Sequence, residues 1–148
     1  MQPLENVEHS TTAQIFAAHL ALIATDIQAW ADLLAEDAVV EFPYACALGS
    51  PERLEGKLTI YNYIKNAIAQ MQNLTFTNIR EYQTSNPDVL FAEVHGEARI
   101  LATGRHYHQD YVMRLETKAG KIFHYREYWN PSSVLDTWSN SRQALNAQ

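Results

Sequence analysis

The sequence is poor in the features that mark several large protein classes. It has one cysteine, Cys46, so no disulfide can form within the chain. Its 11 Lys and Arg against 17 Asp and Glu give a net charge of −6 without a basic cluster, which argues against a nucleic-acid partner. Apolar runs are far shorter than the ~20 residues that cross a bilayer, and the N-terminal MQPLENVEHS lacks the charged and apolar regions of a signal peptide. We therefore expect a cytoplasmic protein with no membrane partner.

Hydrophobic periodicity separates helical segments from a second half made of strands. With 148 residues, 47% of them hydrophobic, and no internal repeat, the chain is predicted to form a single domain over 1–148. Apolar residues at helical spacing predict three helices, over 10–25, after Asp26 and over 57–71. A short strand over 38–42 precedes an irregular loop over 44–56. From residue 74 the period falls to two, which predicts strands over 74–83, 89–102, 105–117 and 121–130. This order indicates an α+β fold with an antiparallel meander.

The last two strands can be aligned from the turn between them. A three-residue loop over 118–120 places Gly120 at the left-handed position that such loops require. This alignment predicts that Glu127 lies opposite Tyr111 and that Tyr125 lies opposite Met113. One face of the hairpin then holds Gln109, Tyr111, Met113, Leu115, Phe123, Tyr125, Glu127 and Trp129. The other, polar face holds His106, His108, Asp110, Arg114, His124 and Arg126.

Glu127 is the single carboxylate on the aromatic and apolar face of this predicted hairpin. Desolvation there raises a carboxyl pKa, and a hydrogen bond from Tyr111 or Gln109 would partly lower it again. A lone carboxyl group with a pKa near neutral pH is what a general acid or base requires. The alternative is a structural glutamate that pairs with an arginine or caps backbone groups near the end of the strand.

Three segments in this order resemble the nuclear transport factor 2-like superfamily in its SnoaL-like branch. They are DIQAWADLLAEDAVVEFP, then RLEG ahead of the third helix, then HQDYVMRLETKAGKIFHYREYWNP. The strongest likeness is to the phenazine-biosynthesis A/B proteins, whose last strand also ends in Arg-Glu-aromatic-x-Asn-Pro. The resemblance implies a cone in which three N-terminal helices pack in the hollow of a strongly curved antiparallel sheet that encloses a pocket. It also implies a homodimer and an acid/base role for Glu127.

Two positions depart from the patterns of the superfamily. Tyr63 stands where the phenazine proteins place a histidine, and tyrosine is a poor base at neutral pH. Phe42 stands where ketosteroid isomerases of the superfamily carry their general-base aspartate, directly before Pro43. We therefore expect neither of those two catalytic machineries.

Histidines elsewhere in the chain are predicted to serve the structure. His106 and His108 on one strand face could ligate a metal, but Arg114 and Arg126 share that face and would repel a cation. We therefore predict no metal, and we expect this convex sheet face to be a polar surface or the contact of the homodimer. His19 on the first helix is predicted to be a satisfied interior or boundary histidine, with a catalytic histidine as the alternative.

The resulting functional prediction is a cofactor-independent enzyme that acts by proton transfer on a hydrophobic, cyclic or aromatic small molecule. The reaction is expected to be an isomerisation, cyclisation, dehydration or condensation, with Glu127 as the acid/base. The predicted substrate-binding residues are Tyr63, Gln109, Tyr111, Met113, Tyr125, Trp129, Trp30 and Phe42. The alternative is a non-catalytic module of the same fold, which binds a ligand or serves as a dimeric association domain.

Overall fold

The computed structural model of the protein describes residues 10–138. Its helices and strands are α1 (Thr12–Ile23), α2 (Ile27–Ala31), β1 (Leu34–Glu41), the 3-10 helix η1 (Ala45–Leu48), β2 (Arg53–Glu55), α3 (Lys57–Ala69), β3 (Met71–Gln83), β4 (Val89–Ile100), β5 (His106–Lys118), β6 (Lys121–Tyr128) and α4 (Pro131–Trp138). No helix within these residues is long and apolar enough to cross a membrane.

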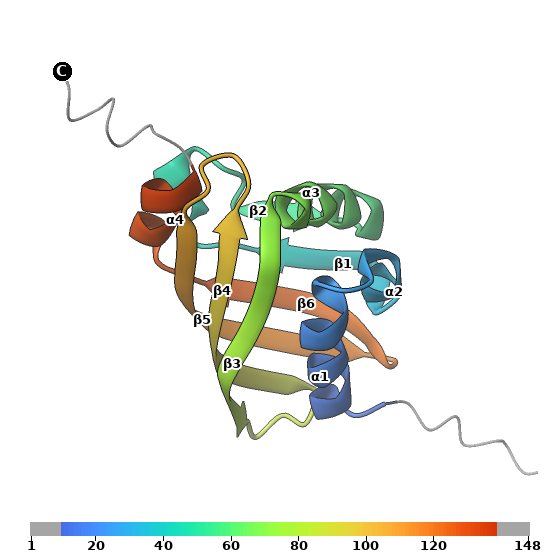
Figure 1. Ribbon diagram of the computed structural model, residues 1–148. Coiled ribbons are helices and arrows are strands. Elements are labelled where there is room, and N and C mark those ends of the chain that lie inside the picture. The colour runs from blue at the N-terminus through green and yellow to red at the C-terminus, as the bar shows by residue number, and fades with distance from the viewer. Residues whose placement is uncertain (1–9, 139–148) are drawn as a thin grey trace, which may run out of the picture.

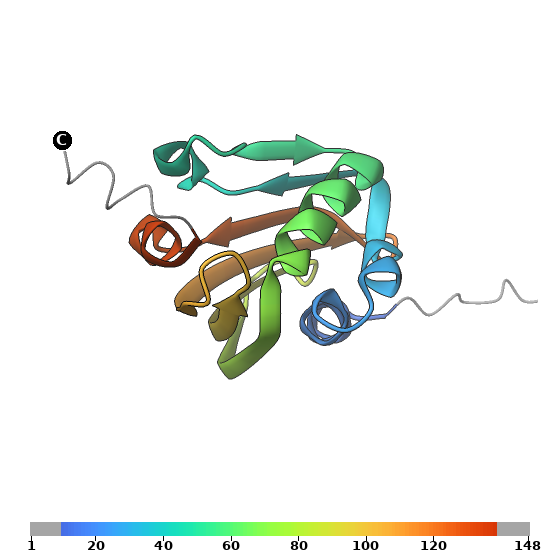
Figure 2. The same ribbon diagram turned by 45° about the horizontal axis from the view of Figure 1, so that its top comes forward.

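The strands form one curved, unclosed sheet in the order β2-β1-β6-β5-β4-β3, and the helices α1 and α3 lie in its hollow (Figures 1 and 2). This arrangement confirms the predicted α+β cone. Part of the curvature comes from β3, whose register with β4 shifts twice, near Asn73 and Asn78. Both asparagines have positive φ, 56° and 51°, as is common for residues that bend a strand at a bulge.

One strand pair departs from the predicted antiparallel sheet. β1 runs parallel to β6, because β2, α3 and then β3, β4 and β5 carry the chain back to the same end of the sheet before β6 begins. The predicted loop over 44–56 is also more ordered than expected. It contains η1 and the short strand β2, in which Leu54 pairs with Val40 of β1.

Side-chain caps fix the beginnings of the first two helices. Thr11 and Gln14 form a capping box, in which each side chain accepts a hydrogen bond from the other residue's backbone N–H. The carboxylate of Asp26 accepts from the backbone N–H of Ala29 at 3.1 Å and thereby starts α2. Thr11 is thus the N-cap of α1, and the helix begins at Thr12.

The hairpin between β5 and β6 corrects the predicted alignment. Its turn has two residues, Ala119 and Gly120, both with positive φ, so Lys118 lies opposite Lys121. Beyond the turn, one extra residue in β6, Phe123, shifts the register again. Two shifts of one residue add up to an even number, and the side chains of β6 after Phe123 therefore point to the face that the sequence predicted.

In the observed register, the residues of β6 lie opposite other residues of β5 than predicted. Met113 lies opposite Glu127, and Tyr125 lies opposite Leu115, instead of the predicted pairs. Phe123 was predicted to point inward, but its ring lies 5.2 Å from the ammonium group of Lys118, and Ile122, 1% exposed, takes the inner position.

Candidate active site

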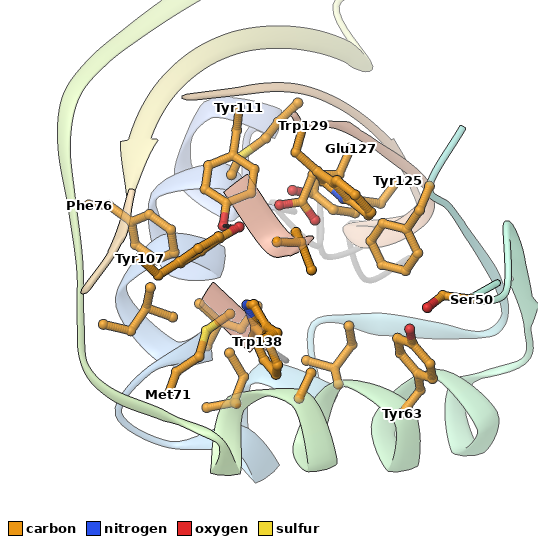
Figure 3. Close-up of a pocket in the computed structure, with 18 of the residues that line it drawn as sticks. Ser50, Tyr63, Met71, Phe76, Tyr107, Tyr111, Tyr125, Glu127, Trp129 and Trp138 are labelled. Atoms are coloured by element: carbon orange, nitrogen blue, oxygen red, sulfur yellow. Dashed lines mark hydrogen bonds between the residues drawn. The ribbon is translucent and has the colours of Figure 1, made fainter. Parts of the chain in front are cut away.

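A cavity of about 220 Å³ lies between the hollow face of the sheet and the helices (Figure 3). β5 and β6 supply one wall, α3 supplies the opposite wall, and α4 contributes Val134 and Trp138 at one end. Nearly all lining side chains are apolar or aromatic, and Glu127 is the one carboxylate among them. The cavity therefore has the composition of a site for a hydrophobic small molecule.

The structure brings most of the predicted site residues to this cavity. Those that line it are Glu127, Tyr63, Tyr111, Met113, Tyr125, Trp129 and Phe42. Trp30 and Gln109 do not line it. Trp30 is 2% exposed and packs in the core against His19 of α1, while Gln109 binds the backbone beyond β6.

Glu127 reaches the cavity from β6, next to the aromatic rings of Tyr125 and Trp129 (Figure 3). Within residues 10–138 its carboxyl group has no hydrogen-bond partner and no ion pair, so neither form of the structural alternative is present. Arg126, its neighbour in the chain, points to the other face of the sheet and binds Glu41 at 3.2 Å. Burial raises the pKa of Glu127 to about 8 from an ordinary value of 4.5. At neutral pH the group is therefore mostly protonated, and it ionises within reach of neutral pH.

Two tyrosines of β5 form a hydrogen-bonded pair beside Glu127. The hydroxyl oxygens of Tyr107 and Tyr111 are 3.1 Å apart, and both rings point into the cavity (Figure 3). Burial raises the pKa of Tyr107 to about 12 and that of Tyr111 well above its ordinary value, so both hydroxyl groups stay protonated. Gly96 on β4 makes room for this pair, because a Cβ there would lie 2.8 Å from Cε2 of Tyr111.

His19 of α1 is a neutral hydrogen-bond donor at the cavity wall. The indole N–H of Trp30 donates to its Nδ1 at 2.9 Å, so the ring proton sits on Nε2. Burial lowers the pKa of His19 to about 4, which keeps the ring neutral. Among the described residues, neither Nε2 of His19 nor the hydroxyl group of Tyr125 has a hydrogen-bond partner, and their rings lie 4.8 Å apart. The prediction of a satisfied interior histidine thus holds for one ring nitrogen only.

Gln109 holds the end of β6 in place. Its amide nitrogen donates to the carbonyl of Asn130 at 3.0 Å, and its amide oxygen accepts from the backbone N–H of Asn130 at 2.9 Å. These two bonds fasten the chain directly after Trp129. Gln109 faces inward as predicted, but the segment after β6 covers it and separates it from the cavity.

Sequence reasoning missed several lining residues. Tyr107 lies four residues before Tyr111 on the same strand and therefore points to the same, inner face. The predicted face began at Gln109, and including the residue two positions earlier would have added Tyr107. Trp138 lines the cavity from α4, and its ring packs edge-on against Tyr107 at 6.3 Å. Proline at the first position of a helix, Pro131 here, was the available signal for α4. Ser50 and Met71 lay in segments without a recognisable site pattern.

Comparison with known families places the chain among proteins with this architecture. Residues 14–125 match the family model of the SnoaL-like domain. The chain belongs to the SnoaL-like family. This confirms the resemblance that the three sequence segments carried, and the described fold agrees with it.

Curated relatives of this SnoaL-like chain come from two bacteria. The protein YesE of Bacillus subtilis is 38% identical over 120 residues, which are 81% of each chain. A PhzA/B-like protein of Pseudomonas aeruginosa is 36% identical over 111 residues, which are 75% of this chain and 77% of the relative. The second relative agrees with the predicted likeness to the phenazine-biosynthesis A/B proteins.

Solved structures share the SnoaL-like fold over most of the chain. A proposed isomerase from Bacillus subtilis has a TM-score of 0.79 and 37% identity, covering 85% of this chain and 91% of that one. A Mycobacterium tuberculosis protein crystallised with estradiol-17β-hemisuccinate has a TM-score of 0.71 and 23% identity, covering 84% of this chain and 98% of that one. The second likeness shows the fold alone.

Proposed function

We propose that this SnoaL-like protein is a cofactor-independent enzyme that transfers a proton on a hydrophobic, cyclic or aromatic small molecule. Glu127 acts as the acid and base, in an isomerisation, cyclisation, dehydration or condensation. The observation that carries the proposal is a carboxyl group with a pKa of about 8, unpartnered within residues 10–138, in an otherwise apolar cavity. A group with its pKa near the working pH exchanges protons most effectively in both directions.

The groups around Glu127 suit a substrate oxygen that gains negative charge. Tyr111, Tyr125 and His19 each present a neutral O–H or N–H donor at the cavity wall. In an isomerisation, the carboxylate of Glu127 removes a proton from a carbon next to a carbonyl and returns it at another carbon. The electron pair left behind moves onto the carbonyl oxygen, where buried donors stabilise it without reorganising.

The walls of the cavity select for a hydrophobic ring system. Phe42 lies 6.2 Å from Tyr63 and 6.4 Å from Trp129, measured between ring centroids, and the three rings line one side of the cavity. The Mycobacterium tuberculosis structure of the same fold holds a steroid derivative, which supports a cyclic hydrophobic ligand for this chain as well.

The test combines binding with proton exchange. A thermal-shift screen of cyclic ketones and aromatic acids identifies compounds that raise the melting temperature by mass action. Each bound ketone is then followed by NMR in D₂O, where the wild type is expected to exchange the hydrogens next to the carbonyl. Glu127→Gln should reduce the rate by about 10²–10⁴-fold, whereas Glu36→Gln, the same change on an exposed side chain of β1, should leave it unchanged. Full exchange activity in Glu127→Gln would overturn the proposal.

A ligand-binding module without catalysis is the second candidate. It is favoured by the protonation of the other cavity groups: His19 stays neutral, and Tyr107 and Tyr111 stay protonated. Glu127, with its pKa raised by burial to about 8, is also mostly protonated at neutral pH, so these groups can hold a ligand as hydrogen-bond donors without removing a proton from it. Saturable binding of the ketones without exchange in the wild type would support this candidate over the enzyme.

We also propose that two copies associate through the convex face of the sheet. Support comes from its charged side chains of both signs, such as Glu97, Arg99 and Arg114, which suit a symmetric contact between identical surfaces. Sedimentation of the full chain should give twice the monomer mass, and Arg99→Glu should shift the equilibrium towards monomer. A monomer at all protein concentrations would contradict this assignment.

A further inference from the structure

Five ionisable side chains gather on the outer face of β4 and β5, on the side of the sheet opposite to the cavity. His95 and Glu97 are two residues apart on β4 and therefore point to the same face. On β5, Asp110 lies opposite His95, His108 lies opposite Glu97, and His106 is the next outward residue. The antiparallel register thus brings three histidines and two carboxylates together.

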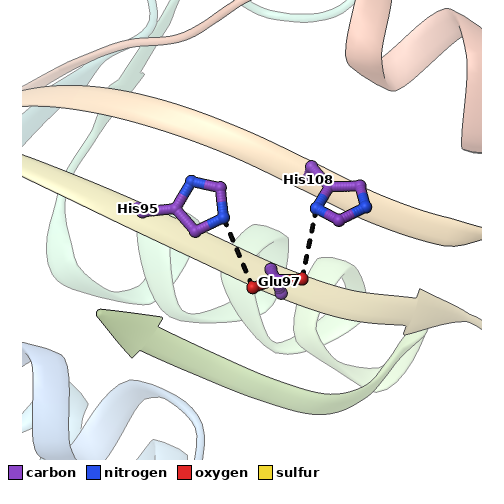
Figure 4. A group of neighbouring side chains, drawn as sticks. All are labelled: His95, Glu97 and His108. Carbon is purple, nitrogen blue, oxygen red and sulfur yellow. Dashed lines mark ion pairs between the residues drawn. The ribbon is translucent and has the colours of Figure 1, made fainter. Parts of the chain in front are cut away.

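The potential metal-binding atoms of this cluster are already close to one another. Nε2 of His95 lies 3.4 Å from Oε2 of Glu97, and Nδ1 of His108 lies 3.2 Å from Oε1 of Glu97 (Figure 4). One ligand atom from each of the three residues fits within 4.8 Å of the others. Tetrahedral zinc with bonds of about 2.0–2.1 Å holds its donor atoms roughly 3.3 Å apart. Small side-chain rotations therefore suffice to place a metal ion between them.

Asp110 gives His95 the orientation that a metal ligand needs. Nδ1 of His95 lies 2.8 Å from Oδ1 of Asp110, and the two carboxylates raise the pKa of the ring, the hydrogen bond to Asp110 most of all. A metal ion at Nε2 displaces the second proton, and the ring then donates its Nδ1 proton to Asp110 and binds the ion through the lone pair on Nε2. Nε2 is the nitrogen that faces Glu97. A histidine held by a carboxylate on one nitrogen and free to bind on the other is the usual outer-shell arrangement at zinc sites.

His106 offers a further donor at the edge of the cluster. Its Nε2 lies 2.8 Å from Oε1 of Glu97, and its ring centroid lies 4.1 Å from that of His108. The side chain is exposed and can rotate, so the fourth position of a tetrahedral ion is open either to His106 or to water.

Arg114 and Arg126, which were expected to repel a cation on this face, do not lie next to the cluster. Arg114 lies six residues beyond His108 on β5, roughly 20 Å along the strand, and its guanidinium group binds Glu116 at 3.1 Å. Arg126 binds Glu41. Arg99 is the nearest arginine along β4, and within residues 10–138 it forms no ion pair with Glu97. The two carboxylates of the cluster leave it suited to a divalent cation.

We propose that His95, Glu97 and His108 bind a divalent transition-metal ion, of which Zn²⁺ is the reference case. Two neutral imidazoles and one carboxylate form a donor set that zinc accepts readily. Asp110 is a positioning residue that acts through His95. The site is complete within one chain and lies on the face opposite to Glu127, so it is independent of the proposed proton transfer.

The test uses the untagged full chain, treated with a chelator and then desalted. Calorimetric titration with Zn²⁺ should give saturable binding of one ion per chain. His95→Ala and His108→Ala should each weaken the affinity at least about tenfold, and Asp110→Asn by about 10–100-fold. His124→Ala is the matched control, because His124 lies on the same sheet face but is bound to Glu41. It should bind zinc like the wild type, as should Glu127→Gln.

Titration with Co²⁺ adds a spectroscopic test, because nitrogen and oxygen ligands in a four-coordinate site give cobalt a strong visible absorption. We expect this absorption in the wild type and its loss in His95→Ala. The proposal is overturned if zinc binding is not saturable, if His95→Ala and His108→Ala bind like the wild type, or if His124→Ala loses affinity to the same extent. Because Glu127 is not part of the cluster, failure here leaves the proposed enzyme activity untouched.

Discussion

Glu127 should make the stability of the protein fall as the pH rises, and Glu127→Gln should abolish this effect. Its pKa is about 8 in the folded state, against an ordinary value of 4.5, and burial is the cause. Between these two values the folded chain holds a proton that the unfolded chain releases. The free energy of unfolding therefore decreases with pH, by about 1.4 kcal/mol per unit.

The total change follows from the width of this window. A shift of 8 − 4.5 = 3.5 units corresponds to about 5 kcal/mol. The side chain is open to the cavity on one side, where water relieves part of the penalty, so we expect about 3–5 kcal/mol. This loss in the free energy of unfolding is absent below pH 4.5 and complete above pH 8. His19, whose pKa is lowered by burial to about 4, adds stability with rising pH between 4 and its ordinary 6.5. That contribution is common to both proteins and cancels in their difference.

Urea unfolding of the wild type and Glu127→Gln at half-unit intervals from about pH 5 to pH 9 measures the difference. The free energy of unfolding of the Gln variant, relative to the wild type, should increase steadily with pH. At the alkaline end the variant should be more stable by about 3–5 kcal/mol. Glu36→Gln, on an exposed side chain, should follow the wild type throughout. Parallel curves for the wild type and Glu127→Gln would show that Glu127 titrates like a solvated carboxylate, and the acid/base assignment would lose its basis.

Three further substitutions test the packing around the cavity, each by urea unfolding. Gly96→Ala places a Cβ 2.8 Å from the ring of Tyr111 and should lower the free energy of unfolding by about 1–3 kcal/mol; an unchanged value would mean that the ring moves freely. Trp30→Phe removes the donor to the buried Nδ1 of His19 and should lower it by about 1–3 kcal/mol, with a change of the His19 tautomer visible by ¹⁵N NMR. Gln109→Leu removes both hydrogen bonds to the segment after β6 and should lower it by about 1–3 kcal/mol. If it instead leaves stability unchanged, solvent replaces those bonds.

The sequence predicted the face of Glu127 correctly although its predicted register was wrong. A shorter turn and the extra residue Phe123 displaced the pairing by two positions, and an even displacement leaves the side chains of a strand on the same face. Burial decided the outcome: Tyr125 is 4% exposed, and a register of opposite parity would have turned it to solvent. Local turn chemistry did not contain this information, because the bulge depends on the packing of the whole sheet.

Contacts between distant segments explain the parts of the site that remained unpredicted. Gln109 and Trp30 have side chains that suit a binding site, but their neighbours are fixed only in the folded chain: Asn130 binds Gln109, and Nδ1 of His19 accepts a hydrogen bond from the indole N–H of Trp30. The position of Trp138 depends on α4, which packs beside β5. Periodicity predicts the face of the sheet or helix on which a side chain lies. It does not predict which distant segment packs over that side chain.

The charge of the cavity leads to a last prediction, on the pH dependence of ligand binding. With Glu127 protonated, the polar groups at the wall are donors, including the hydroxyl group of Tyr125 and Nε2 of His19, so an anionic aromatic probe such as 2-naphthoate is accommodated. Ionisation of Glu127 places a second negative charge nearby. At about 5 Å and an effective dielectric constant of about 20, the repulsion is about 3 kcal/mol. The affinity for the anion therefore falls about tenfold for each pH unit above the pKa of about 8, which is about tenfold at pH 9.

We therefore expect 2-naphthoate to bind more tightly at about pH 6 than at pH 9, across the pKa of about 8, while the neutral 2-naphthol changes much less over the same range. In Glu127→Gln the affinity for 2-naphthoate should no longer depend on pH, because the remaining donors stay neutral over this interval. Fluorescence titration with both probes measures these affinities at the two pH values in the wild type and in Glu127→Gln. An equal pH dependence in the wild type and in Glu127→Gln would show that another group causes the effect. It would also show that the carboxyl group of Glu127 does not lie near the bound ligand.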